Sequence, residues 1–373
     1  MDHGDHESAE RPTPEHEDAI LNRISRRIKG ARNHKPRKRE QGKYFVSDTE
    51  DFWDRHLADL VNDTLGLGIA RSEGLAPFGE LIGNAFGTTR FLLAGYVQLG
   101  GHVNNLALSD WMPTSPRTSP KIHALVQLHA RSLVLIEEIF VLTTMGYPSG
   151  ASALARTLHE VRVLATFLHR FEAQLSERYL ASHIVELWKN RADFAPSGAA
   201  HRSRAWLATE RELDERYREV IAKFGDSMTI ENGWALPRFT KERNKGSALP
   251  RRIPFARLEE QVRRPFDRVI YRSGSQQVHA SRLGSIKTLR AGEPNVALLG
   301  PRLYDLDRAA NQAMWDAQDV TESLLRSCGK FTGNLDIYYW LEALDQLSYI
   351  VRGSVSDGQD LLDSVFAKSS AAD

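Results

Sequence analysis

The sequence has few of the residues that stabilise an extracellular protein or anchor a membrane protein. Its 373 residues include one cysteine, Cys328, which excludes an intramolecular disulfide and a four-cysteine structural zinc site. The longest apolar run, 133–142, is interrupted by Glu137 and Glu138, and it is too short and too charged to span roughly 30 Å of bilayer hydrocarbon. The first residues lack the basic and apolar regions of a secretory signal. We therefore expect a cytoplasmic protein that does not enter a membrane.

Several catalytic motifs are also absent. The sequence has no P-loop, no Gly-x-Ser-x-Gly, no His-Glu-x-x-His and no EF-hand loop. Nucleotide hydrolysis at a Walker site, serine hydrolysis and zinc-protease chemistry therefore have no support in the sequence. His102, His123 and His129 are scattered over apolar segments, as structural histidines usually are. We predict neither a metal site nor a cofactor.

The formal net charge of +1 conceals a strong segregation of charge near the N-terminus. Residues 1–20 are acidic, residues 23–43 are strongly basic, and the whole stretch 1–43 is poor in aliphatic side chains. Such a composition predicts a disordered charged arm. The arm either serves as a solubilising tail or contacts nucleic acid through its basic half, because phosphate contacts need no fixed fold.

Beyond this arm, apolar residues recur at helical spacing and no strand pattern of useful length or fixed-period repeat is visible. We predict an all-α protein, a bundle of about six to eight long helices. Residues 44–110 form an N-terminal helical region with glycine interruptions, 109–120 a linker, 121–352 the core domain and 353–373 a C-terminal tail. The expected core helices are 121–145, 150–171, 176–194, 203–225, 265–280, 304–328 and 336–351.

An irregular basic insertion interrupts the helical pattern between Leu236 and Arg264. It holds three prolines and nine lysines or arginines, opposed by three glutamates. Such a stretch favours a positive surface for a polyanion such as RNA. The residues that we expect to bind the polyanion are Arg251, Arg252, Arg263 and Arg264.

The helix expected at 150–171 has two apolar sides. Leu158 and its helical neighbours form a stripe that must face the core, while Arg156 and Glu160 lie on the opposite side among further apolar residues. A buried charge is costly unless it is paired or binds a ligand, so two interpretations are open. The two residues form an ion pair that fixes packing, or Glu160 orients a group on a neighbouring helix. The polar residues on the remaining side of this helix are His159, Arg162, Thr166 and His169.

The helix expected at 265–280 carries a second group of polar residues. Tyr271, Ser275 and His279 recur every four residues, and Arg272 lies seven residues before His279, so all four can face one groove. Imidazole is suited to proton transfer near neutral pH and a guanidinium to phosphate, a pairing that favours phosphodiester chemistry. The alternative is a structural histidine in the core. Under both interpretations we expect Glu160 or Arg156 to reach Tyr271, Ser275 or His279.

The motifs Ala153–Glu160 (ALARTLHE) and Tyr271–Ser281 (YRSGSQQVHAS) resemble the bacterial domain of unknown function 5677 family over roughly residues 120–350. In addition, Arg272 followed by six residues and His279 is similar to the signature of the HEPN superfamily. These helical-bundle proteins include metal-independent ribonucleases of toxin–antitoxin and phage-defence systems. Ser273 stands where active members carry Asn, Asp or His.

This resemblance implies a defence- or toxin-type protein that acts on RNA as a metal-independent endoribonuclease. His279, Arg272 and Glu160 are then the catalytic residues, and Arg156, Tyr271 and Ser275 bind or orient the substrate. The alternative is a non-catalytic helical scaffold or sensor subunit of a multi-protein bacterial defence system. Both imply association with a second copy or a partner protein.

Overall fold

The chain is seen in a computed structural model, and it divides into two compact units, Met1–Asn84 and Ala85–Asp373. In the described part of the chain, seven helices have 17 residues or more, which confirms the predicted all-α helical bundle. The structure describes residues 19–20, 22–23, 26, 47–112, 119–195, 203–240, 251–264, 289–290, 293–297 and 301–370.

The first unit contains residues 47–84 of α2, a helix that spans Ser47–Ser109 without a break. The predicted glycine interruptions do not end this helix, and Pro77 also lies inside it. Of the charged arm predicted for residues 1–43, only five residues are described, and all five are helical. Within this unit Arg23 Nε lies 3.9 Å from the carboxylate of Asp63.

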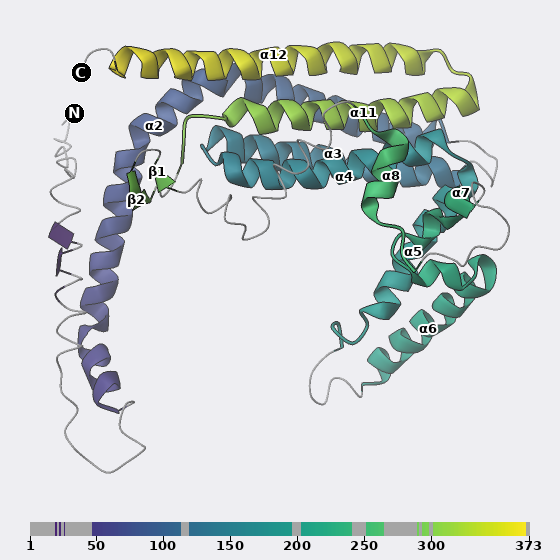
Figure 1. Cartoon of the computed structure of the whole chain (residues 1–373), viewed down its shortest axis with the longest axis horizontal. Coiled ribbons are helices and arrows are strands. Elements are labelled where there is room, and N and C mark those ends of the chain that lie inside the picture. The colour runs from purple at the N-terminus through teal and green to yellow at the C-terminus, as the bar shows by residue number, and fades with distance from the viewer. Residues whose placement is uncertain are drawn as a thin grey trace, which may run out of the picture. The chain divides into compact units, whose positions relative to one another are not determined.

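The second unit is built around three mutually packed helices, α3, α4 and α11, with α12 lying along α11 (Figure 1). Their interior consists of fully buried aliphatic side chains such as Leu125, Ile136, Leu158 and Leu324. No helix in the described ranges is both long and apolar enough to cross a bilayer. The four helices are α3 (Ser119–Thr144), α4 (Pro148–Arg170), α11 (Leu306–Thr332) and α12 (Asp336–Ser370).

A smaller layer of helices follows α4. Arg178 on α5 connects this layer, because its guanidinium donates to the backbone carbonyls of Phe224, Gly233 and Trp234 and to Ser227 Oγ. These bonds satisfy carbonyl groups at the end of α6 and in the turn that follows. The elements of this layer are α5 (Ala173–Lys189), α6 (Arg204–Phe224), η2 (Asp226–Thr229), η3 (Gly233–Ala235), α7 (Leu236–Thr240) and α8 (Phe255–Val262).

The predicted core helices agree with α3 to α6 and α11 within a few residues. The helix predicted at 265–280 lies outside the described residues. One feature was not predicted: β1 (Leu289–Arg290) pairs antiparallel with β2 (Glu293–Ala297) in a two-stranded sheet. Strands this short leave too few alternating positions for a sequence pattern to be recognised.

The predicted end of the last helix is corrected by the structure. We expected a tail from residue 353, whereas α12 continues to Ser370. Val355 and Leu362 are fully buried, and a Cβ at Gly358 would lie 2.7 Å from the backbone oxygen of Ala85 in α2. Tertiary contact with α2 therefore sustains a helix whose glycines and serines locally favour a break.

Candidate functional site

Arg156 and Glu160 form an ion pair one turn apart on α4, with Arg156 NH2 and Glu160 Oε1 3.0 Å apart. This is the ion pair that one of the two sequence interpretations expected. Their side chains are 20% and 33% exposed, however, so the pair lies at the edge of the packed layer and is not buried. A helical wheel orders the sides of a helix but cannot show which side its neighbours cover.

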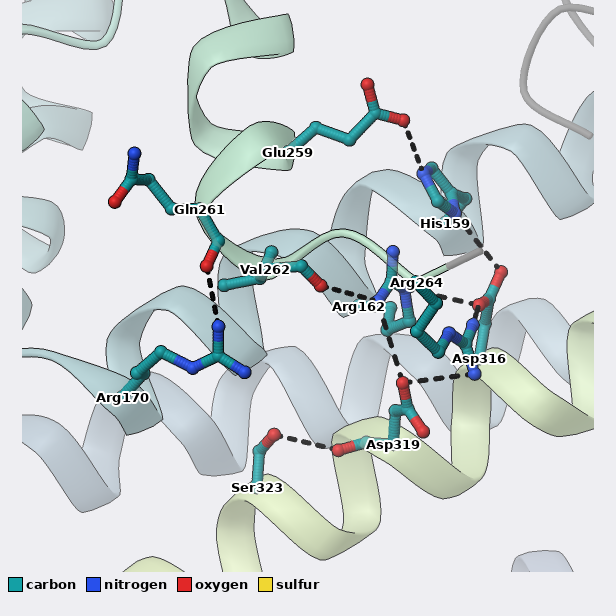
Figure 2. A network of polar contacts seen from close by, with 10 residues as sticks. All are labelled: His159, Arg162, Arg170, Glu259, Gln261, Val262, Arg264, Asp316, Asp319 and Ser323. Carbon is teal, nitrogen blue, oxygen red and sulfur yellow. Dashed lines mark hydrogen bonds and ion pairs between the residues drawn. The ribbon is translucent and has the colours of Figure 1, made fainter. Parts of the chain in front are cut away.

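The buried charges of α4 are instead His159 and Arg162, which the sequence placed on the remaining polar side. Both residues are fully buried, because α8 and α11 cover that side of the helix. His159 Nε2 lies 3.2 Å from Glu259 Oε1 on α8, and His159 Nδ1 lies 3.6 Å from Asp316 Oδ2 on α11 (Figure 2). One imidazole thus contacts carboxylates from two helices.

Arginines extend this network along α11. Arg162 Nε is 3.3 Å from Asp316 Oδ1, and its NH1 is 3.6 Å from Asp319 Oδ2. Arg264, which follows α8, contacts Asp316 and also reaches Asp319 Oδ2 at 3.1 Å. Figure 2 shows the two guanidiniums converging on the two aspartates. We call His159, Arg162, Glu259, Arg264, Asp316 and Asp319 the buried ionic cluster.

The electrostatics of the cluster differ between its two aspartates. Burial by itself raises the pKa of Asp316, but the hydrogen bond and charge of His159, together with Arg162 and Arg264, outweigh burial and hold the pKa below its ordinary value. At Asp319 burial prevails, and the pKa is raised despite Arg264 and Arg162. The cluster contains three carboxylates, two guanidiniums and one imidazole. With a neutral imidazole its net charge is one negative unit, so one further proton within the cluster makes it neutral.

Two arginines of α4 also cap the C-terminal end of α8. Arg162 NH1 donates to the backbone oxygen of Val262 at 3.5 Å, and Arg170 NH1 donates to that of Gln261 at 2.6 Å. The last carbonyls of a helix have no partner within the helix, and a nearby guanidinium satisfies them favourably. Arg238 on α7 adds a third contact, from NH2 to Gln261 Oε1 at 3.1 Å. Together these contacts fix where the chain leaves α8.

A second buried polar group surrounds His129 on α3. His129 Nδ1 donates to Asn104 Oδ1 at 2.8 Å, and its Nε2 lies 3.0 Å from Thr321 Oγ1. Tyr96 OH lies 3.0 Å from the same hydroxyl and 3.2 Å from Gln318 Oε1. Burial lowers the pKa of His129 to about 4, so the ring is neutral near pH 7. These contacts make His129 part of the core, as the sequence indicated.

The polar helix that the sequence singled out is not described. Tyr271, Arg272, Ser275 and His279 all lie outside the described residues, so the expected contact between Glu160 and this group stays a prediction.

The four expected polyanion-binding residues are all within described segments. Arg251, Arg252 and Arg263 are exposed, as a polyanion-binding role requires. Arg264 differs, because its charge is compensated by Asp316 and Asp319. Its role in the described structure is therefore to anchor the chain at the point where it enters residues 265–288.

The sequence reasoning did not identify Glu259, Asp316 or Asp319. A signal for Asp316 was present, because it lies three residues after Ala313 and four before Val320, on a stripe of apolar residues. No comparable signal marks Glu259, which lies in a strongly charged segment. Within the described ranges, no group of three or more His, Cys, Asp or Glu side chains is arranged to hold a metal ion.

These features define a helical-bundle protein with a buried ionic cluster at the junction of α4, α8 and α11. Residues 122–293 match the model of a family of unknown function, DUF5677. The matched segment includes α4 and α8 but ends before α11, so both aspartates of the cluster lie outside it. Searches of curated proteins and of solved structures give no match.

Proposed function

We propose that this protein acts on RNA in a bacterial defence or toxin–antitoxin setting, as a metal-independent endoribonuclease of the cytoplasm. One observation carries the proposal. The buried ionic cluster holds α8 and Arg264 against α4 and α11, while Arg251, Arg252 and Arg263 of the same segment face solvent. A positive surface of this kind attracts a polyanion, and it directly precedes the segment that contains Arg272 and His279.

The chemistry follows from the residue types. His279 accepts the proton of a ribose 2′-hydroxyl as its oxygen attacks the neighbouring phosphorus, or donates a proton to the departing 5′-oxygen. Arg272 neutralises the charge that develops on the phosphate oxygens. Tyr271, Ser275 and the Arg156–Glu160 pair orient these groups. The similarity of Arg272 and His279 to the HEPN signature supports this assignment.

The test compares the wild-type protein with His279→Ala on total RNA, with EDTA present and RNA lengths resolved by electrophoresis. We expect the wild type to cleave and the variant to lose activity by at least about 100-fold, the usual contribution of a general acid or base. His183→Ala on α5, an exposed histidine away from the cluster, serves as the control. Indistinguishable RNA profiles for the wild type and His279→Ala would remove the catalytic role.

A second candidate is a non-catalytic scaffold or sensor subunit. It is favoured by exposed aromatic residues on α12, where Tyr339 is 76% exposed and Tyr349 is 67% exposed, because such side chains often contact a partner protein. In this case His279 is structural, and His279→Ala lowers the melting temperature by several degrees, since losing a buried hydrogen-bonded group costs about 1–3 kcal/mol. A catalytic histidine can be replaced with little loss of stability.

A further inference from the structure

The outward side of α12 carries apolar and acidic side chains together. Tyr339, Ile350 and Leu361 are exposed and follow one another at intervals of 11 residues. Eleven residues are close to three helical turns, so these side chains lie within about 40° of one another around the helix axis. Among the described side chains of α12, six acids are exposed and no lysine or arginine is exposed. The six acids are Asp336, Glu342, Asp345, Asp357, Asp360 and Asp363, and we call this side of α12 the acidic face.

The one arginine of α12 is held against aromatic rings. The Cζ atom of Arg352 lies 3.6 Å from the ring centroid of Trp315 on α11 and 5.7 Å from that of Tyr349. Both rings are exposed. Tryptophan, tyrosine and arginine are the residue types that most often dominate the binding energy of protein interfaces. The acidic face therefore has an aromatic group at its edge that is already ordered by stacking in the single chain.

A second surface, in the same compact unit, has the opposite charge. In residues 251–264, four arginines and one glutamate, Glu260, are exposed, while Glu259 is buried. The exposed net charge of the segment is therefore 4 − 1 = +3. Leu258 and Val262 are buried where α8 packs against α4, so a fixed element presents this charge. The four exposed arginines, which we call the arginine surface, are Arg251, Arg252, Arg257 and Arg263.

The two surfaces are chemically complementary. A guanidinium pairs with a carboxylate through its N–H donors and stacks on an aromatic ring through its flat face. The acidic face offers exposed carboxylates together with the exposed rings of Tyr339 and Tyr349. Both surfaces are exposed in the single chain, so they do not cover one another. A contact between them therefore requires a second copy of the chain.

We infer that the protein self-associates, with the acidic face of one copy bound to the arginine surface of another. Two acidic faces would repel each other, because like charges opposed across an interface are unfavourable. The contact joins two different surfaces, so it is made twice in a two-fold dimer or once with each neighbour in a ring. This inference goes beyond the proposed function. Because the arginine surface also attracts RNA in that proposal, a bound second copy competes with RNA for it.

The first measurement uses the wild-type chain without RNA. Sedimentation velocity over a series of protein concentrations gives the mass of the species in about 0.1 M and about 1 M salt, between which the Debye length falls from about 10 Å to about 3 Å. We expect a species larger than one chain at the lower salt concentration and a single chain at the higher one. A single chain at every protein concentration in about 0.1 M salt would overturn the inference.

The second measurement reverses the charge of each surface in turn. Asp357→Lys with Asp360→Lys makes the acidic face basic, and Arg252→Glu with Arg257→Glu makes the arginine surface acidic. Each double variant alone opposes like charges, so we expect its dissociation constant to rise by at least about 100-fold. An equal mixture of the two should associate again, because the new lysines of one chain then meet the new glutamates of the other.

The matched control reverses two exposed acids on α6, in the double variant Glu215→Lys with Glu219→Lys. This change alters the net charge of the chain as much as the reversal on α12 does, but it leaves both surfaces intact. We expect this variant to associate like the wild type.

Recovery in the mixture also shows that both double variants are folded, since an unfolded chain cannot restore the contact. If either double variant associates like the wild type, the chain associates through other surfaces and the inference is wrong. If both are single chains and their mixture does not associate, the two surfaces do not bind each other and the inference is equally wrong. All of these measurements are made without RNA, so either failure leaves the proposed action on RNA standing.

Discussion

Asp316 is the residue on which the charges of the buried ionic cluster converge. It is fully buried, and it contacts His159 and Arg162 from α4 and Arg264 from the stretch that follows α8. A carboxylate in this position is stabilised only because the two guanidiniums and the imidazole replace the water it has lost. The same contacts hold these three side chains against Asp316, so removing its charge affects all three.

We expect Asp316→Asn to lower the free energy of unfolding by about 3–5 kcal/mol at pH 7, because Arg162 and Arg264 are left with the partly exposed Asp319 as their remaining counter-charge. The pKa of Asp316 is held below its ordinary value, so its contribution is present above about pH 4 and is lost as the pH falls through the folded-state pKa. The difference from the wild type should therefore shrink only in strong acid. Urea unfolding at several pH values measures it, with the exposed Asp360→Asn as control. A loss below about 1 kcal/mol at pH 7 would contradict this account.

His129 provides a separate dependence on pH. Burial lowers its pKa from 6.5 to about 4, so the unfolded chain binds a proton in this interval that the folded protein excludes. The stabilisation is complete above pH 6.5 and is lost as the pH falls towards 4. We expect His129→Gln, which keeps a donor and an acceptor but does not titrate, to make this loss smaller by about 3 kcal/mol. Equal losses for the wild type and the variant between pH 7 and pH 4 would show that His129 is protonated in the folded state.

At the scale of elements, α4 connects the molecule through three different sides. Its apolar stripe packs in the core, its His159 and Arg162 side binds α8 and α11, and its Arg156–Glu160 pair stays at the edge. α12 packs against α2 where Gly358 lies close to the backbone of Ala85. The contacts of α4 with α8 and α11 require polar side chains, and the close approach of α12 to α2 requires a glycine.

Two glycines of α12 test this close approach. A Cβ at Gly358 would lie 2.7 Å from the backbone oxygen of Ala85 and from the ring of Phe86, whereas a Cβ at Gly353 meets nothing within 4 Å. Both substitutions to alanine gain about 1 kcal/mol of helix propensity, but overpacking at Gly358 costs about 1–3 kcal/mol. We expect Gly353→Ala to raise the melting temperature above that of the wild type. We expect Gly358→Ala to melt at a lower temperature than Gly353→Ala. Equal stabilisation by the two substitutions would show that α2 and α12 do not touch there.

At the scale of the whole molecule, the division into two units falls inside α2. From Ala85 onward this helix contributes buried residues to the second unit, among them Phe86, Leu93 and Tyr96. Tyr96 also joins the polar group around His129. The second unit therefore contains its own core, and this core includes the C-terminal part of α2.

We expect a shortened chain of residues 85–373 to fold and to unfold in urea with nearly the midpoint of the full chain. A chain that begins at Leu99 lacks Phe86, Leu93 and Tyr96, and we expect it to be less stable by several kcal/mol, since burying each large side chain contributes about 1.5–3 kcal/mol. Circular dichroism and denaturant titration measure both. If residues 85–373 do not fold, the first unit supplies part of the core.

The sequence by itself determined the features that depend on neighbours within a few residues. Helical periodicity located α3 to α6 and α11, and the spacing of four residues predicted that Arg156 and Glu160 can pair. Tertiary structure decided which side of each helix is covered. His159 and Arg162 became the buried charges because Glu259 lies 100 residues away and Asp316 is on a later helix, and α12 extends to Ser370 because α2 lies against it. Helix formation follows from local spacing, whereas burial depends on surfaces that distant segments supply, so only the assembled structure specifies it.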